Sequence, residues 1–204
     1  MIPGIVAGRA VPSPVGEVTL TAASGTWVCP AGVTRVCAVL VGKGGKGVNQ
    51  GGYWCAGGDG GALAFKNNIA VVPGTSYSFV IGSTTQIFGL RVFAGVNGYS
   101  SPNYQNRYGS EATTDGAPDG RCNGAAAYSV GDPERGAVGG GAGRYEGTPA
   151  AAGVGVGLFG TGSTGSYGAG GVTAYSYSGR VTPGGPGAIR IIWGTGRSFP
   201  SNAS

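Results

Sequence analysis

The sequence predicts an all-β protein: a jelly-roll-like β-sandwich with a glycine-rich lobe of extended, polyglycine-type segments and loops, and little or no α-helix. Three observations predict this fold. Short stretches of alternating apolar and polar residues are bounded by Gly and Pro, as is typical of strands. Glycine supplies 46 of 204 residues, yet 41% of the chain is hydrophobic, which is too much for a disordered chain. The stretch 95–186 holds few large apolar residues, so an ordinary core cannot form there.

The sandwich is expected from residues 17–94 together with 187–193. Its expected strands are, in chain order, 17–21, 26–29, 34–41, 61–65, 68–72, 76–81, 86–93 and 188–193. Both faces of 34–41 are apolar, which places this strand inside the sandwich. The last strand has to pair with strands at least 90 residues upstream, which favours Greek-key or jelly-roll connections.

The stretch 95–186 is expected to form a glycine-rich distal lobe. From Gly157 onward, glycine recurs every third residue in two registers, which end at Gly160 and Gly171. Three residues per turn is the period of the polyproline II helix, and glycine on one side lets such helices approach closely. We therefore expect packed extended glycine helices in this lobe, with plain flexible loops as the alternative.

The two ends of the chain are expected to lie outside these units. Residues 1–16 read as an extended, Pro-punctuated attachment arm, because such arms dock onto a neighbour rather than fold alone. Residues 194–204 are expected to form a C-terminal tail. The first ten residues lack the charged and apolar regions of a signal peptide, and no stretch has the length of a membrane span.

Histidine is absent, which excludes the commonest general base and all His-ligated metal sites. The eight acidic residues stand singly, so we expect no enzyme, no cofactor and no metal site. The loop from Asp115 to Asp119 could offer oxygens to a calcium ion, but a solvated turn is favoured. The net charge of +5 comes from scattered residues, so nucleic-acid binding and membrane insertion are not expected.

The four cysteines match no zinc or CxxC spacing. Cys37 lies in an apolar strand and is expected to pack as a small hydrophobe. A disulfide between Cys55 and Cys122 would link two glycine-rich regions covalently. It is one of several pairings that four cysteines allow.

Tyrosines with neighbouring amide and arginine side chains mark the middle of the chain. Rigid rings beside adaptable hydrogen-bonding groups are typical of recognition surfaces. The alternative is that these tyrosines only cover a domain that is poor in apolar residues. The receptor-contact candidates are Tyr99, Tyr104, Asn106, Arg107, Tyr108, Tyr128, Tyr145 and Tyr167.

Several motifs that are not simply glycine-rich resemble the glycine-rich virion proteins of tailed bacteriophages, especially those of aquatic cyanophages. The motifs are the opening Met-Ile-Pro-Gly-Ile-Val-Ala7, Ser24-Gly-Thr-Trp-Val-Cys-Pro-Ala-Gly-Val-Thr34, Gly60-Gly-Ala-Leu-Ala-Phe-Lys-Asn-Asn68, Val72-Pro-Gly-Thr-Ser-Tyr77 and the end Gly187-Ala-Ile-Arg-Ile-Ile-Trp-Gly-Thr-Gly-Arg-Ser-Phe-Pro-Ser201. The resemblance covers nearly the whole chain. The longest glycine run here, Gly139–Gly141, is shorter than in many such proteins.

The resemblance implies a virion protein of the phage tail or particle surface, such as a tail-fibre or tail-tip component that contacts the host. Related tip adhesins carry bundles of polyglycine helices whose loops touch the receptor. The expected partners are fibre, baseplate or neck subunits, a host glycan or outer-membrane protein, and further copies of the chain. Attachment is expected through Ile2, Pro3, Ile5 and Val6. The alternatives are a capsid or tail decoration subunit without receptor contact, and a free carbohydrate-binding module.

Overall fold

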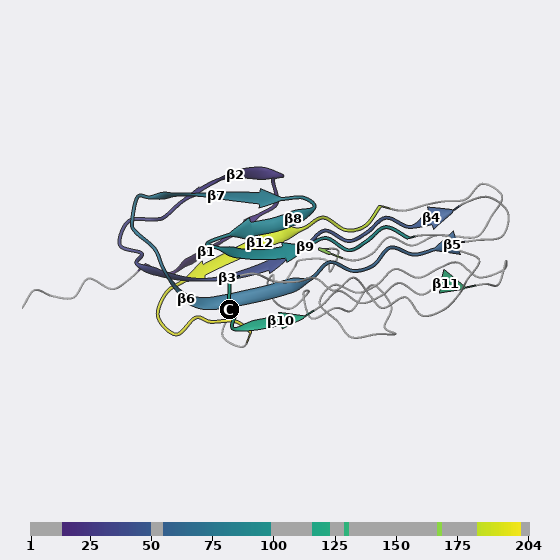
Figure 1. The fold of residues 1–204 in the computed structure, drawn as a ribbon. Helices are drawn as coiled ribbons and strands as arrows, with labels where there is room; N and C mark the ends of the chain where they lie inside the picture. The colour runs from purple at the N-terminus through teal and green to yellow at the C-terminus, as the bar shows by residue number, and fades with distance from the viewer. Residues whose placement is uncertain are drawn as a thin grey trace, which may run out of the picture.

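The computed structural model describes residues 14–49, 55–98, 116–122, 129–130, 167–168 and 183–200. All regular secondary structure in these ranges is β, and they contain no helix, which confirms the all-β class. Two antiparallel sheets form a sandwich, and extended segments lead from one end of it to a small third sheet (Figure 1). The jelly-roll topology stays a prediction.

The larger sheet of the sandwich has five strands. Their order is β1 (Gly16–Leu20), β12 (Ala188–Trp193), β3 (Arg35–Val41), β6 (Leu63–Ala70) and β10 (Gly120–Cys122). The last long strand, β12, lies between β1 and β3, and its Ile191 is level with Val18 on one side and Ala38 on the other. The expected pairing of this strand with strands far upstream is therefore confirmed.

The smaller sheet of the sandwich has four strands. Their order is β2 (Ser24–Val28), β7 (Ser76–Ile81), β8 (Thr84–Ile87) and β9 (Leu90–Phe93). Residues that face inward from this sheet, such as Phe79 and Val92, pack with Leu40 and Ile189 of the larger sheet in one core cluster. Burial of these side chains, at about 25 cal/mol per Å² of apolar surface, holds the two sheets together.

The outer face of the five-stranded sheet is also buried. Val39, Leu63 and Ile192 point to this side and pack with Phe199. Asn67 holds Phe199 in place, because its side-chain amide donates to the Phe199 carbonyl at 2.9 Å and accepts the Phe199 N–H at 2.8 Å. Residues 194–200, expected as a tail, thus cover this face, which explains why β3 is apolar on both sides.

Two expected strand boundaries were wrong. Residues 61–65 and 68–72 were expected as two strands, but β6 runs unbroken from Leu63 to Ala70, with a register shift against Val36 and Ala38 of β3. The stretch 86–93 was expected as one strand and is a hairpin of β8 and β9. Phe88 and Gly89, with φ of 54° and 77°, make its two-residue turn.

The third sheet lies at the far end of the extended segments (Figure 1). It consists of β11 (Ser129–Val130), β5 (Cys55–Ala56) and β4 (Val48–Asn49), all antiparallel. The strands β4 and β5 belong to the stretch 42–62, which the sequence predicts as part of the sandwich. The described parts of that stretch instead run out from the sandwich and back (Figure 1).

Candidate functional site

The segments between the sandwich and the third sheet form a glycine bundle, defined here as residues 42–47, 57–62, 94–98 and 183–187. They run side by side without the ladder of a β-sheet (Figure 1). Their backbones are joined by hydrogen bonds from one segment to another. The bundle therefore holds its shape through backbone contacts rather than through an apolar core.

Three of the segments form a closed ring of hydrogen bonds with a three-residue repeat. Each segment donates to the next one: 42–47 to 57–62, 57–62 to the 93–96 stretch, and 95–98 back to 43–46. The bonds are Gly42 N to Ala62 O, Gly45 N to Asp59 O, Asp59 N to Val96 O, Ala62 N to Phe93 O, Gly95 N to Lys43 O and Gly98 N to Lys46 O, at 2.7–3.2 Å. Gly44 N also donates to Gly185 O of the fourth segment at 2.9 Å.

Glycine is required at particular positions of the bundle, because the backbones there approach too closely for a side chain. A Cβ atom added at Gly95 would lie 2.7 Å from the carbonyl carbon of Asp59, and one at Gly45 would lie 2.5 Å from that of Val96. Real Cβ atoms essentially never lie within 3.0 Å of another heavy atom. The same obstruction by backbone atoms occurs at Gly42, Gly58, Gly61 and Gly184.

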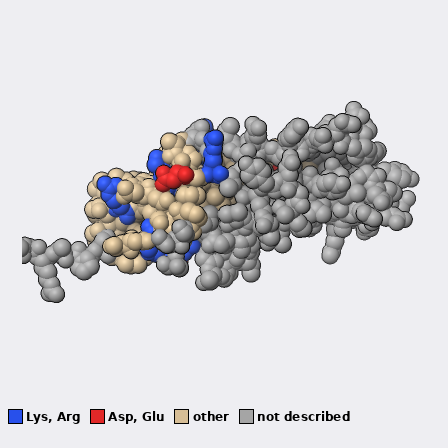
Figure 2. All heavy atoms as spheres, turned by 90° about the horizontal axis from the view of Figure 1, so that it is seen from below, with Lys and Arg blue, Asp and Glu red and all other residues tan. Residues whose placement is uncertain are grey.

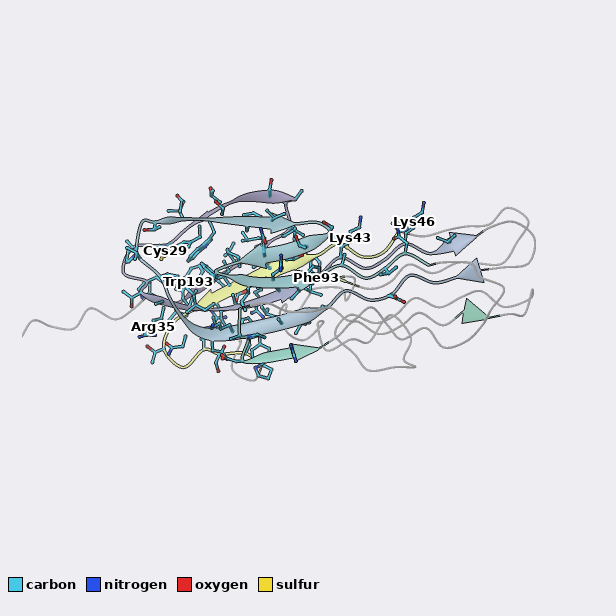
Figure 3. All side chains as sticks on the ribbon, in the orientation of Figure 1. Cys29, Arg35, Lys43, Lys46, Phe93 and Trp193 are labelled. Carbon is cyan, nitrogen blue, oxygen red and sulfur yellow. The ribbon has the colours of Figure 1, made fainter. Side chains whose placement is uncertain are left out.

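Exposure in the bundle follows the same three-residue period. Lys43 and Lys46 are exposed, whereas the two glycines between them are buried. Figure 3 shows both lysines at the bundle end of the molecule, on the same side. Residues 57–62 are buried throughout, and Asp59 is only 4% exposed, so this segment lies inside the bundle.

The three-residue glycine period of the bundle lies in other residues than the run from Gly157 to Gly171, whose prediction as packed glycine helices stays untested. Of the run that begins at Gly157, the structure describes only Gly168, which accepts the Gly61 N–H and donates to Pro186 O. The signal in the bundle is the G-x-x-G spacing at 42/45, 58/61, 95/98 and 184/187. Each G-x-x-G pair contains only two glycines, so in the sequence it cannot be told from the glycines of ordinary turns.

Tyr167 alone among the receptor-contact candidates lies within the described residues. It is half-buried and packs on the cluster around Leu63 and Phe199, so at least part of its ring serves packing. The other candidates lie outside the described residues: Tyr99, Tyr104, Asn106, Arg107, Tyr108, Tyr128 and Tyr145. The attachment candidates Ile2, Pro3, Ile5 and Val6 also lie outside them.

The cysteines fall into two groups. Cys29 and Cys37 are buried free thiols, and burial raises the pKa of both. The Cys37 thiol donates to the Arg197 carbonyl at 3.4 Å, so it packs as expected inside the fold. The backbones of Cys55 and Cys122 lie in β5 and β10, but their side chains are outside the described part, so the disulfide stays a prediction.

The end of the sandwich that faces away from the bundle carries an ionic network. Glu17 accepts hydrogen bonds from Arg190 at 2.8 Å and Arg197 at 2.5 Å. These two bonds hold the pKa of the Glu17 carboxyl below its ordinary value of 4.5. Arg197 also donates to the Gly16 carbonyl at 2.7 Å, so the network ties β1 to the segment that follows β12.

The described residues bring together no group of side chains suited to bind a metal ion. Asp119, one end of the loop considered for calcium, accepts the Asn67 N–H at 2.7 Å. No three His, Cys, Asp or Glu residues in the described ranges gather as metal ligands. What this part of the molecule provides is a stiff glycine support and a charged sandwich end.

Comparison with known proteins finds no relative of this chain. No protein-family model matches the chain, and a search of curated proteins finds no match. Among the residues that the structure describes, no helix is long and apolar enough to cross a membrane.

Proposed function

We propose that this chain is a structural protein of a phage particle, a tail-fibre or tail-tip component that contacts the host surface. The observation that carries the proposal is the ring of three-residue hydrogen bonds in the glycine bundle. Bundled glycine helices are the architecture of the tip adhesins that the sequence motifs resemble. The sandwich would attach to the particle, and the connecting loops beyond the bundle would meet the host.

The physical properties of the bundle suit this role. Its backbones are locked by hydrogen bonds and by close contacts at Gly45 and Gly95, so it is stiff without a wide apolar core. A narrow, stiff support can carry loops that vary in sequence without loss of the fold. Binding surfaces on loops positioned by a rigid scaffold are a common arrangement for recognition.

The test measures binding of the fluorescently labelled chain to host cells. Three forms are compared: the full chain, a chain without residues 1–16, and a chain in which 99–108 is replaced by a Gly-Ser linker of equal length. We expect the first two to bind and the third to bind poorly. If the 1–16 deletion abolished binding while the loop replacement did not, the two ends would have the opposite roles.

The number of copies per particle separates this function from the alternative of a decoration subunit. Quantitative mass spectrometry of purified particles should find a few dozen copies or fewer, and antibodies against the sandwich should label the tail. Hundreds of copies with labelling of the capsid would refute the tail-tip assignment in favour of decoration.

A further inference from the structure

The strand β2 lies at one edge of the four-stranded sheet and has an open backbone edge. It pairs with β7 on one side, from Ser24 opposite Val80 to Val28 opposite Ser76 (Figure 1). Gly25, in the middle of β2, is exposed. Because glycine consists of main-chain atoms alone, this exposure shows that solvent reaches the backbone of the strand. A further strand can be added to a sheet at such an edge.

The hydrogen bonds to β7 determine which backbone groups of β2 point outward. Ile81 N donates to Ala23 O at 2.7 Å, and Cys29 N donates to Thr75 O at 2.9 Å. Hydrogen-bonded and non-hydrogen-bonded pairs alternate along an antiparallel ladder, so the odd-numbered residues of β2 are those bonded to β7. The N–H and C=O groups of the even-numbered residues therefore point away from β7.

These even-numbered residues are Ser24, Thr26 and Val28, and all three are exposed. Within the part of the chain that the structure describes, their outward backbone groups have no hydrogen-bond partner. The edge thus offers three donors and three acceptors, at every second residue, to another extended strand.

The strand β2 lacks the features that usually keep sheet edges apart, which are charged residues, proline and bulges. The other three outer strands of the sandwich each contain a charge: Glu17 in β1, Arg91 in β9 and Arg121 in β10. By contrast, β2 contains neither a charge nor a proline, and its pairing with β7 has no register shift.

The surroundings of β2 are uncharged as well. The stretches 18–34 and 67–90, which include β2, β7 and β8, contain none of the charged residues of the chain. Figure 2 shows the molecule from below, the side away from β2, and charged side chains lie on the sandwich there. Two copies of the chain can therefore meet at β2 without bringing like charges together, although each has a net charge of +5.

The open edge of β2 is complementary to itself. If two copies meet about a two-fold axis at Thr26, Thr26 lies opposite Thr26 of the second copy, and Ser24 lies opposite Val28 of the second copy. All three residues then form hydrogen-bonded pairs, so every outward N–H meets a C=O of the other copy. Threonine pairs across strands are favourable, and the Val28 side chain, at 55% exposure, becomes partly covered. This match favours a second copy over an unrelated extended segment.

We propose that β2 pairs with β2 of a second copy about a two-fold axis at Thr26, which joins two four-stranded sheets into one of eight strands. Because both copies use the same edge, the contact closes on itself and stops at the dimer. The pairing rests on the geometry of β2 and does not depend on the proposed function.

The test is sedimentation velocity of the purified full chain from about 1 µM to about 1 mM, over which a monomer–dimer equilibrium is expected. Thr26→Glu would place two carboxylates opposite each other, with about 5.5 Å between the Cα atoms. It should weaken the dimer at least about tenfold through repulsion. An equimolar mixture of the Thr26→Glu and Thr26→Lys variants should restore dimers, because opposite charges then face each other.

Ser78→Glu is the matched control. Ser78 is opposite Thr26 on β7 and is exposed on the same face. In the dimer, however, its two copies would lie about 15 Å apart, which is three strand spacings. This variant should change the dissociation constant less than about twofold. With oxidised glutathione, Thr26→Cys should form a disulfide-linked dimer and Ser78→Cys should not, because only the first pair lies within disulfide range.

Three results would overturn the proposal. A chain that stays monomeric over the whole range has no such contact. Equal losses from Thr26→Glu and Ser78→Glu, or no recovery in the mixture, would show that copies associate elsewhere or in another register. Loss of dimers on deletion of residues 1–13 would assign the edge to that segment of a second copy. Thermal unfolding checks that every variant folds.

Discussion

Alanine at Gly45 is expected to break the glycine bundle. The new Cβ would lie 2.5 Å from the Val96 carbonyl carbon and closer still to its oxygen, whereas ordinary contact begins at 3.4 Å. The segments 42–47 and 94–98 would therefore have to separate by at least about 0.9 Å, the difference between these two distances.

This separation acts on the two hydrogen bonds that join the same segments. Gly95 N to Lys43 O at 2.7 Å and Gly98 N to Lys46 O at 2.8 Å would lengthen beyond about 3.5 Å, where a hydrogen bond is lost. Each buried bond that breaks costs about 1–2 kcal/mol, because its donor and acceptor are left without partners. The substitution should lower the free energy of unfolding by about 2–4 kcal/mol.

Urea denaturation followed by circular dichroism measures the loss, and hydrogen exchange shows whether the amides of Gly95 and Gly98 lose protection first. Gly82→Ala is the control, since nothing lies within 4 Å of a Cβ at that turn position. This substitution should be neutral or should raise the free energy of unfolding by up to about 1 kcal/mol, because alanine lowers the conformational entropy of the unfolded chain. If the two variants agreed within about 0.5 kcal/mol, close packing of glycine would not support the lobe.

Three further predictions concern the sandwich. Thr85 is fully buried and its hydroxyl finds no hydrogen-bond partner among the described residues, so Thr85→Val should raise the free energy of unfolding by about 1 kcal/mol in urea titrations; a decrease would reveal a hidden partner. Glu17 has a lower pKa in the folded than in the unfolded chain, so its stabilising effect is present above pH 4.5 and is lost as the pH falls through the folded pKa. Because the carboxyl is half-exposed and screened, Glu17→Gln should cost about 1 kcal/mol at pH 7, and the difference should shrink as the pH falls below 4.5; a difference independent of pH would contradict the ion-pair explanation. Burial and the raised pKa of Cys37 should keep it unlabelled by iodoacetamide until urea is added, as peptide mapping by mass spectrometry would show; rapid labelling of the native chain would disprove it.

The elements that could be predicted from sequence are those with long, regular patterns. Residues 36–41 are a continuous apolar stretch, and 188–193 are apolar except for Arg190; both lie in strands that are buried on two faces. The hairpin turn at Phe88 and Gly89 was missed because its first residue is not the usual Asn, Asp or Gly at positive φ. The unbroken strand β6 was missed because its Lys-Asn-Asn stretch resembles a turn signal, and pairing with β3 overrides that local preference.

The candidate sites were harder to predict than the fold. Glycine composition indicated a lobe of extended segments, but its members come from four distant parts of the chain, and a G-x-x-G spacing only two glycines long has no distinctive pattern.

The composition and the alternation of apolar and polar residues were enough to predict an all-β chain. They also showed that the chain has no histidine, and that part of it has too few apolar side chains for a core and must pack through glycine. Those properties are local, since each residue carries its own polarity, size and backbone freedom. Folding determined which glycines touch and which face residues 194–200 cover. Those properties depend on backbone hydrogen bonds and contacts between residues that are remote in the chain, such as Gly45 with Val96 and Asn67 with Phe199.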